Sequence, residues 1–528
     1  MLTDGQLIEE PRRFLSDEDR DALKPVHVVW EITLACDLKC QHCGSRAGKR
    51  RTGELSTEEC FDLIRQMARL GTREVTIIGG EAYMRRDWTE LIREIRSQGM
   101  DCTMQTGGLH LTEEKIKQAA AAGLQAGGVS IDGLPELHDR LRGVKGSFDA
   151  ALKALRLMRE YGLTTSVNTQ ITAQVIPQMR QLMEVFIEAG ARNWQIQLTV
   201  AMGRAADHPE LLLQPYNLLE LMPLIAELYR EGVGRGFLIQ PGNNIGYFGP
   251  YESVWRGSGD DRVHWSSCNA GENTMGIEAD GTIKGCPSLP TDAYAGGNIR
   301  DLTLEDIWRK TPELSFARTR TVDDLWGFCR TCYYADVCRA GCTWTTHVLF
   351  GRAGNNPFCH HRALELAERG QRERIERVEA APGKPFDHGR FELRLESIDG
   401  GPTPSVKASS ADEGVTLNGK TNGHGNTNGN GSGLGKPAAV IGITSQPLVQ
   451  IKSSGKRSAQ SSQKVSDHAH TIPPPLTVCR GCHRYVKPNT TICPHCDGNM
   501  TSLTLAYEKK VRTAQRAMRR LLKHLPAS

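Results

Sequence analysis

Apolar and polar positions follow a repeating order between residue 27 and about residue 240. A short apolar segment typical of a strand is followed by an amphipathic helical segment, then a glycine, and then the next apolar segment. The glycines stand where a helix is expected to end in a residue with positive φ, at Gly71, Gly99, Gly123, Gly162 and Gly190. The pattern predicts six strands, near residues 27–33, 74–78, 101–106, 126–131, 164–170 and 194–199.

This alternation of strands and helices predicts the fold class. Strands separated by helices imply a parallel sheet with right-handed crossovers. Six such units in series favour an α/β fold with a partial (βα)6 TIM-like barrel over residues 26–250, with a doubly wound open sheet as the alternative. In α/β barrels the chemistry is found at the C-terminal ends of the strands. Functional residues are therefore expected directly after each strand.

The chain departs from this order on both sides of the barrel. Residues 1–25 form an N-terminal segment, and residues 251–370 are loop-rich, with many glycines and seven cysteines, which indicates a domain organised by metal. The charged segment 371–395 is interpreted as a helical extension. Residues 396–475 contain "LNGKTNGHGNTNGNGSGLG", which buries too little apolar surface to fold and predicts a flexible linker. Its apolar island, "AVIGITSQPLVQI", is interpreted as a transiently ordered segment, with strand addition to a partner as the alternative.

Composition and charge narrow the class of protein. A chain of 528 residues is long enough for two or three domains of about 100 to 200 residues each. The net charge of +4 favours no anionic partner for the chain as a whole. The N-terminus lacks the apolar core of a signal peptide, and no segment approaches the roughly 18 apolar residues of a membrane helix. The expected location is the cytoplasm, with no membrane partner.

Sixteen cysteines need an explanation in such a chain. A reducing cytosol does not sustain a disulfide framework, and clustered thiols there more often hold metal or perform redox chemistry. Only Cys60 and Cys102 stand alone, so the other fourteen fall in clusters. Cys60 lies in a helical segment that begins with a capping box, Ser56 and Glu59, and Cys102 lies in a predicted strand. Both are expected to be small buried hydrophobic residues.

The segment 476–528 predicts a zinc ribbon followed by a basic helix. In "CRGCHRYVKPNTTICPHC" two pairs of cysteines have the spacing of a tetrahedral zinc site, with an iron-sulfur site as the alternative; the ligands are Cys479, Cys482, Cys493 and Cys496. The following helix carries seven Lys or Arg residues and one Glu. A basic helix is compatible with a nucleic acid or an acidic partner, but a solvated helix face explains the pattern at least as well, so nucleic acid is not the expected partner.

Three further thiols lie in one tight loop directly after the first strand, in "ACDLKCQHCGS": Cys36, Cys40 and Cys43. A cubane iron-sulfur cluster has four iron corners, and thiolates are its ordinary ligands. Three cysteines in one loop hold three corners and leave the fourth iron for a non-protein ligand. A zinc knuckle or a purely structural cluster is the alternative that the spacing alone leaves open.

The loop "CDLKCQHC" resembles the CxxxCxxC loop of radical S-adenosylmethionine (radical SAM) enzymes, with His42 at a position that is usually aromatic in that family. "IIGGEA" after the second strand is similar to the family's GGE motif, with Ala82 in place of a common proline. "VSIDG" after the fourth strand resembles a further cofactor-contacting segment. The resemblance implies a [4Fe-4S] cluster that binds S-adenosylmethionine, and a cofactor site formed by Gly79, Gly80, Glu81, Ser130 and Asp132.

The later cysteines follow the order Cx12Gx4C, gap, Cx2Cx5Cx3C, gap, C, where the glycine is Gly281. This order resembles the seven-cysteine SPASM module of enzymes that modify peptides and proteins. The resemblance implies two auxiliary [4Fe-4S] clusters, one held by Cys329, Cys332, Cys338 and Cys359 and the other by Cys268, Cys286 and Cys342. The fourth iron of the second cluster is left to substrate, water or another ligand. The auxiliary clusters either accept an electron or hold the fold together, and the spacing does not choose between these roles.

Together the motifs predict an oxidoreductase-type radical SAM/SPASM enzyme that matures a peptide or protein. Reductive cleavage of S-adenosylmethionine would give a 5′-deoxyadenosyl radical that removes hydrogen from the substrate, with a flavodoxin- or ferredoxin-type electron donor. The alternatives are a small-molecule or tetrapyrrole-modifying enzyme and, from another class, an iron-sulfur electron carrier or nucleic-acid-binding sensor. The segment before the first strand is too short for a leader-recognition domain, so a separate partner or the ribbon is expected in that role. No catalytic side chain is singled out, but polar residues predicted on the inner faces of strands are candidate substrate contacts: Gln105, Asn168, Gln170, Gln195 and Gln197.

Overall fold

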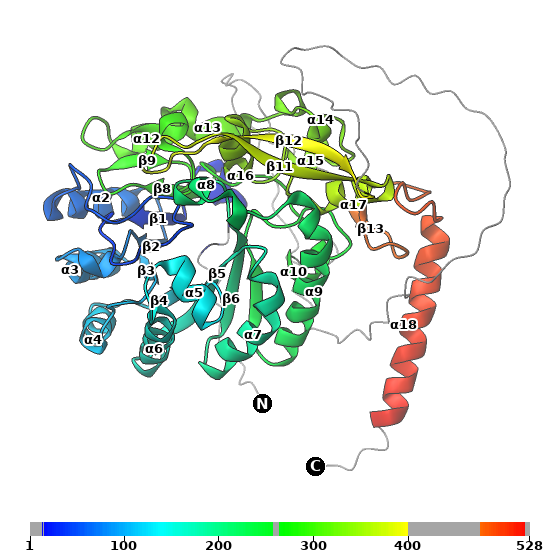
Figure 1. Cartoon of the computed structure of the whole chain (residues 1–528), viewed down its shortest axis with the longest axis horizontal. Helices are drawn as coiled ribbons and strands as arrows, with labels where there is room; N and C mark the ends of the chain where they lie inside the picture. The colour runs from blue at the N-terminus through cyan, green and yellow to red at the C-terminus, as the bar shows by residue number, and fades with distance from the viewer. Residues whose placement is uncertain (1–12, 14, 257–262, 400–475, 523–528) are drawn as a thin grey trace, which may run out of the picture. The chain divides into compact units, whose positions relative to one another are not determined.

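The computed structural model describes residues 13, 15–256, 263–399 and 476–522 (Figure 1). These residues fall into two compact units. The first contains the described residues up to 399 together with the short segments 476–478 and 483–485. The second contains Cys479–Cys482 and residues 486–522.

The six predicted strands are present in the first unit and pair in parallel, each with the next along the chain. They confirm the α/β fold class with a partial barrel. Their bounds are β1 (His27–Glu31), β2 (Glu74–Ile78), β3 (Asp101–Thr106), β4 (Ala126–Ser130), β5 (Thr164–Ile171) and β6 (Asn193–Leu198).

The crossover helices cover the outer side of these strands (Figure 1). They are α2 (Thr57–Arg69), α3 (Trp88–Ser97), α4 (Glu113–Ala121), α6 (Ser147–Glu160) and α7 (Met179–Glu188). A further helix, α5 (Pro135–Arg142), precedes α6, and its last two carbonyls accept hydrogen bonds from Lys39 and Gln41 in the loop after β1. Ser56 and Glu59 form the capping box expected before α2. All five glycines expected after helices have φ between 79° and 100°, a region that favours glycine because it has no Cβ.

Side chains alternate along the barrel strands between the helix-covered face and the interior. In β5, Val167, Thr169 and Ile171 are buried, whereas Asn168 and Gln170 between them are partly exposed. The same alternation in β3 and β6 gives Gln105, Gln195 and Gln197 the partly exposed, inner positions. Cys60 and Cys102 are fully buried, as expected of apolar core residues. The helix-covered face therefore carries the core, and the inner face carries the polar groups.

The sheet continues beyond the six predicted strands into the cysteine-rich segment. Its strand order is β10-β9-β8-β1-β2-β3-β4-β5-β6-β7. Four strands were not predicted: β7 (Leu238–Pro241), β8 (Thr274–Ile277), β9 (Thr282–Lys284) and β10 (Ala295–Asn298). β8 pairs in parallel with β1, with His27 opposite Thr274. The barrel and the cysteine-rich segment therefore share one sheet.

The turn between β8 and β9 explains the glycine of the Cx12Gx4C pattern. Gly281 has φ +89°, and a Cβ there would lie 2.8 Å from Ile299 Cγ1 and 3.0 Å from Leu55 Cδ2. The remaining helices of this unit are α1 (Asp17–Asp21), α8 (Arg204–Asp207), α9 (Leu218–Gly234), α10 (Glu252–Arg256), α11 (Thr291–Tyr294), α12 (Leu304–Lys310), α13 (Pro312–Thr319), α14 (Phe328–Thr331), α15 (Ala335–Cys338), α16 (Thr343–Phe350) and α17 (His360–Glu368).

The helical extension predicted for residues 371–395 is wrong. α17 ends at Glu368, Gly370 has φ +66°, and the chain then forms an antiparallel hairpin of β11 (Gln371–Glu379) and β12 (Arg390–Ser397). Opposite charges pair across the two strands, as in Arg372 with Glu396 at 2.8 Å. These charged residues form ion pairs between the two strands. In the sequence alone, their pattern resembles the charged surface of a helix.

The tail contains β13 (Thr477–Val478), β14 (Tyr485–Val486) and α18 (Met500–Leu522). The helix expected after the ribbon is therefore present. Residues 400–475, which hold nearly all of the predicted linker and its apolar island "AVIGITSQPLVQI", lie outside the described residues. Among the residues that the structure describes, no helix is both long enough and apolar enough to cross a bilayer.

Candidate functional site

The thiols of Cys36, Cys40 and Cys43 lie together in the loop that follows β1. Backbone hydrogen bonds fix the loop: Cys36 N–H donates to the Gly48 carbonyl at 3.1 Å, and Gly48 N–H donates to Leu34 at 3.0 Å. Two sulfurs accept backbone N–H groups, Cys36 from Leu38 and Cys43 from Ala47, each at 3.4 Å.

These thiols fit a metal cluster better than free nucleophiles. Burial raises the pKa of Cys40 to about 11, although the nearby Arg142 guanidinium lowers it, and burial together with Glu81 raises the pKa of Cys36 above its ordinary value. A reactive cysteine needs a lowered pKa, whereas a metal deprotonates a coordinating thiol outright. One buried and two partly buried thiols, with backbone N–H groups directed at two of the three sulfurs, therefore match iron-sulfur ligation.

The GGE segment after β2 lies directly against this loop. Gly80 N–H donates to the Thr33 carbonyl at 2.8 Å, and Glu81 N–H donates to Ala35 at 2.7 Å. A Cβ on Gly80 would lie 2.2 Å from the Ala35 oxygen and 2.6 Å from Cys36 Cβ. Only glycine permits so close an approach of the two backbones.

The Glu81 carboxylate is buried beside the first thiol. It accepts a hydrogen bond from Gly107 N–H at 2.6 Å and another from the Thr106 hydroxyl. Burial raises its pKa to about 7, although these two hydrogen bonds lower it. Ligand atoms of Cys36, Asp37 and Glu81 lie within 4.8 Å of one another. The site therefore places two carboxylates next to the candidate ligand Cys36, where they can receive a cationic group.

Asp132 lies behind the cysteine loop. It contacts His42 Nε2 at 2.9 Å and Arg142 Nη2 at 2.5 Å, and it accepts Gln170 N–H at 2.8 Å. Burial raises the pKa of Asp132, but Arg142 and His42 outweigh it and hold this pKa well below its ordinary value. Asp132 therefore contacts His42 of the cysteine loop, Arg142 of α5 and the backbone of β5. Ser130, at the end of β4, lies opposite Asn168 in the sheet.

Arg142 contacts this site, although the sequence does not indicate it. Its side chain is 10% exposed and its Nη1 lies 3.6 Å from Cys40 Sγ. It stands at the C-terminal end of α5, where the sequence offers an ordinary helix-ending arginine. Only the folded structure reveals this contact, because it joins residues 102 positions apart in the sequence.

The polar residues of the barrel interior meet across the strands. Asn168 Nδ2 donates to Gln105 Oε1, and a Cβ on Gly128 between them would lie 2.0 Å from that oxygen. Gly128 therefore makes room for this pair. Asn168 lies opposite Gln195, and Gln170 lies opposite Gln197. The interior thus offers amide groups suited to hydrogen bonding a polar substrate.

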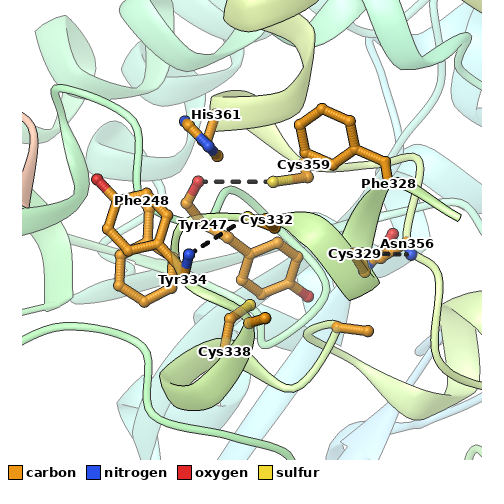
Figure 2. A pocket seen from close by; sticks show the side chains of 12 residues that line it. Tyr247, Phe248, Phe328, Cys329, Cys332, Tyr334, Cys338, Asn356, Cys359 and His361 are labelled. Atoms are coloured by element: carbon orange, nitrogen blue, oxygen red, sulfur yellow. Dashed lines mark hydrogen bonds between the residues drawn. The ribbon is translucent and has the colours of Figure 1, made fainter. Parts of the chain in front are cut away.

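A second group of four thiols, Cys329, Cys332, Cys338 and Cys359, lines a pocket (Figure 2). The walls include the aromatic rings of Tyr247, Phe248, Phe328 and Tyr334. Cys332 accepts Tyr334 N–H and Cys329 accepts Asn356 N–H, each at 3.4 Å. Burial raises the pKa of Cys332 to about 12. An apolar pocket lined by four thiols fits a fully protein-ligated cluster.

Cys268, Cys286 and Cys342 form a third group. Burial, together with the neighbouring thiols of the group, raises the pKa of Cys286 to about 11 and that of Cys342 to about 12. Cys268 and Cys286 pack against a buried cluster of Ala270, Leu289 and Tyr294. Every cysteine of the chain is a free thiol. The structure thus brings the seven cysteines together in two sets, of four and of three.

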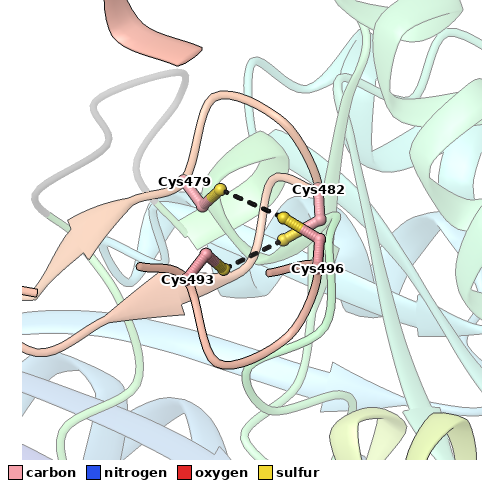
Figure 3. A group of neighbouring side chains, drawn as sticks. All are labelled: Cys479, Cys482, Cys493 and Cys496. Atoms are coloured by element: carbon pink, nitrogen blue, oxygen red, sulfur yellow. Dashed lines mark hydrogen bonds between the residues drawn. The ribbon is translucent and has the colours of Figure 1, made fainter. Parts of the chain in front are cut away.

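The tail cysteines form a group of their own in the second unit (Figure 3). The ligand atoms of Cys479, Cys482, Cys493 and Cys496 all lie within 4.8 Å of one another. Cys479 Sγ lies 3.8 Å from Cys496 Sγ, and Cys482 Sγ lies 3.7 Å from Cys493 Sγ. Four converging thiols of this spacing fit a tetrahedral zinc ion.

Comparison with known proteins agrees with this arrangement. Residues 30–177 match the family model of the radical SAM superfamily, and residues 268–333 match the SPASM model, described as an iron-sulfur cluster-binding domain. These ranges contain the first thiol group and the start of the cysteine-rich segment.

Two kinds of curated relative match at about the same level. The chain is 30% identical over 355 residues to an AdoMet-dependent heme synthase of Oleidesulfovibrio alaskensis, an alignment that covers 63% of this chain and 86% of that relative. It is also 30% identical over 338 residues to the mycofactocin maturase MftC of Mycolicibacterium smegmatis, covering 62% and 81%.

Solved structures share the fold. Native anSMEcpe with bound AdoMet matches with a TM-score of 0.51 at 17% identity, covering 65% of this chain and 95% of that one. Streptococcus suis SuiB bound to S-adenosylmethionine matches with a TM-score of 0.50 at 19% identity, covering 61% and 73%. At these identities the likeness concerns the architecture alone.

Proposed function

Because the chain belongs to the radical SAM superfamily and is an iron-sulfur enzyme with a SPASM domain, we propose that it removes hydrogen from a peptide or protein substrate during peptide maturation. The observation that supports this proposal most directly is the position of Cys36, Cys40 and Cys43 at the C-terminal end of β1. Glu81 lies beside Cys36, and the barrel interior is polar. This is the end of an α/β barrel at which active sites are built.

The residues present can hold the cofactors that the family uses. The three loop thiols would hold a [4Fe-4S] cluster with one iron open to S-adenosylmethionine, and Gly79, Gly80, Glu81, Ser130 and Asp132 would surround that molecule. When bound, the pair supplies a one-electron cleavage of the sulfonium that yields methionine and a 5′-deoxyadenosyl radical. The chain's own contribution is to fix the loop through Gly80, to place carboxylates near the open side, and to present amides to the substrate.

The remaining thiols would hold two auxiliary [4Fe-4S] clusters, one on each set of the SPASM domain, and a zinc ion in the tail. We assign residues 26–250 to the barrel domain and 251–370 to the auxiliary-cluster domain. A flavodoxin- or ferredoxin-type protein would supply electrons in the cytoplasm. A separate leader-binding protein would present the substrate to the barrel.

The peptide class is supported by the mycofactocin maturases among the relatives and by the fold likeness to SuiB, a structure of which contains the precursor peptide SuiA. A tetrapyrrole substrate is the second candidate, because AdoMet-dependent heme synthases match at 30% identity. The auxiliary thiol sets are compatible with both substrates.

Product analysis separates these candidates. The reconstituted, reduced protein is incubated with S-adenosylmethionine and either a candidate precursor peptide or an iron porphyrin that carries propionate groups. We expect 5′-deoxyadenosine together with a mass change in the peptide. A mass change in the porphyrin alone would establish the second candidate. An iron-sulfur carrier or sensor would give no 5′-deoxyadenosine above the level found without reductant.

A further inference from the structure

Two short segments of the tail are buried within the first compact unit. Residues 476–478 and 483–485 belong to that unit, although about 75 residues of undescribed chain precede them. Leu476 is 2% exposed, Val478 is 3% exposed and Tyr485 is fully buried. An apolar segment buried to this degree is part of a core rather than a loosely attached tail.

These segments pack against the wall of the four-thiol pocket. Leu476, Val478 and Tyr485 share one buried cluster with Phe248, Tyr334 and Cys338, and the last three also line the pocket. The Tyr334 ring stacks on Phe248 with ring centroids 4.1 Å apart (Figure 2). The Tyr334 hydroxyl donates to the Tyr485 carbonyl at 2.5 Å. The tail segments thus pack against two of the aromatic rings that line the pocket.

Polar contacts fix the same segments. The Tyr485 hydroxyl donates to the Val263 carbonyl at 2.8 Å. The Arg484 guanidinium, whose side chain is 7% exposed, contacts Glu368 at 3.0 Å and Glu365 at 3.3 Å. Both glutamates lie on α17, which begins directly after the ligand candidate Cys359. The contact is therefore specific and partly desolvated, unlike a surface ion pair.

The chain that joins the two segments is the first knuckle of the predicted ribbon. It consists of Cys479–Cys482, and its two thiols converge with Cys493 and Cys496. An ion held by all four sulfurs would fix both ends of this four-residue connection, and metal binding of this kind supplies folding free energy. Without the ion the connection is an unconstrained loop that holds the segments on either side less firmly.

We propose that residues 476–478 and 483–485 form a cover on the wall of the four-thiol pocket, and that a zinc ion held by the tail thiols fixes the connection between these two segments and so keeps the cover in place, which shields the auxiliary cluster from solvent. The proposal rests on the proposed function for the presence of that cluster. It assigns the ribbon a role within this chain, in place of nucleic-acid binding. It also means that deletion of residues 396–528 would open the pocket as well as remove the tail.

Two measurements on the full-length holoenzyme test the cover. The first is the rate at which auxiliary iron is released to a ferrous chelator under anaerobic conditions, with the contribution of the four-thiol site obtained by difference from Cys329→Ala. The second is amide hydrogen exchange of the pocket peptides around Tyr334 and Asn356, which requires no cluster. Zinc content is determined in parallel.

Cys493→Ser removes a tail ligand that lies outside the cover, and Tyr485→Ala removes the cover's largest side chain. Both variants should release iron about tenfold faster than the wild type, equivalent to about 1.4 kcal/mol of local stability, with faster exchange at Tyr334. Tyr161→Ala is the matched control, because Tyr161 bonds Glu113 on the barrel exterior, and it should leave both rates unchanged. If Tyr485→Ala does not fold, Tyr334→Phe tests the same contact, since it removes only the hydroxyl.

Wild-type iron release and wild-type exchange in zinc-free Cys493→Ser would overturn the proposal. Slow exchange in the wild type with no iron at the four-thiol site would instead refute the auxiliary cluster while leaving the cover in place. The two failures are therefore distinguishable.

Discussion

Arg142 donates a hydrogen bond to the sulfur of Cys40 across 3.6 Å. The same guanidinium lies 2.5 Å from the Asp132 carboxylate, whose side chain is 1% exposed. One buried arginine thus links a proposed cluster ligand to a buried acid. Hydrogen bonds to cluster sulfurs affect both ligand geometry and reduction potential.

Replacing Arg142 should lower both the stability of the fold and the retention of iron at the cysteine loop, and the two effects can be measured separately. Arg142→Met removes the guanidinium that pairs with the buried Asp132 carboxylate, so the free energy of unfolding should fall by about 3 to 5 kcal/mol, measured by urea unfolding. The double variant Arg142→Met/Asp132→Leu should recover most of that loss, because the buried charge is gone. Iron retention at the loop should stay reduced in both variants, since Cys40 loses its donor. Full iron retention in the double variant would show that Arg142 is purely structural.

Gly80→Ala should abolish cofactor cleavage while the rest of the protein stays folded. The added Cβ would lie 2.2 Å from the Ala35 oxygen, so the cysteine loop must move away from the GGE segment. We expect less than about a tenth of the wild-type 5′-deoxyadenosine and lower iron at the loop. Gly234→Ala is the control, because nothing lies within 4 Å of a Cβ there. Equal product from both variants would contradict this role of Gly80.

His138 should make stability depend on pH. Burial and the neighbouring Arg142 lower its pKa to about 4, whereas Asp132 and Asp139 raise it. Its Nδ1 accepts Asp132 N–H at 3.1 Å, which requires the neutral ring. Because the folded-state pKa lies below the ordinary 6.5, the stability is present above pH 6.5 and is lost as the pH falls toward 4.

Between pH 7 and pH 5 this histidine should account for about 2 kcal/mol of lost stability. His138→Asn keeps an acceptor near the Nδ1 position and does not titrate, so its urea midpoint should change less over this interval. An identical pH dependence in the variant and the wild type would contradict the assignment.

Asn168→Ala should weaken substrate binding without affecting cleavage of S-adenosylmethionine. Asn168 bonds Gln105 inside the barrel and lies outside the cysteine loop. With a peptide substrate, KM should rise about tenfold, consistent with the loss of one hydrogen bond in a desolvated site. Substrate-free formation of 5′-deoxyadenosine should match that of the wild type. A fall in that uncoupled rate would place Asn168 in the cofactor site instead.

The barrel could be predicted because its signals are local. Gly71 and Gly99 end helices with positive φ, and the apolar segments between them become β2 and β3 as expected. The pairing of β8 with β1 could not be foreseen, because it joins positions nearly 250 residues apart through backbone hydrogen bonds. The hairpin of β11 and β12 was missed because its charges pair between strands, as Arg372 does with Glu396.

For the candidate site, spacing identified the thiols but not their surroundings. The sequence places Asp132 after a barrel strand, and only the fold shows that Arg142 and His42 contact it. In the same way, nothing local to "CRGCHRY" indicates that Tyr485 is buried within the first unit. Contacts of this kind depend on side chains meeting across the fold, which a pattern along one segment does not encode.

Product formation by the anaerobically reconstituted enzyme tests the central claim most directly. After reduction and addition of S-adenosylmethionine, the wild type should form 5′-deoxyadenosine and methionine in equal amounts. The variant with Cys36, Cys40 and Cys43 all replaced by Ala should form neither, while keeping its auxiliary iron. A loop occupied by zinc, or a wild-type yield no higher than that of the triple variant, would contradict the account.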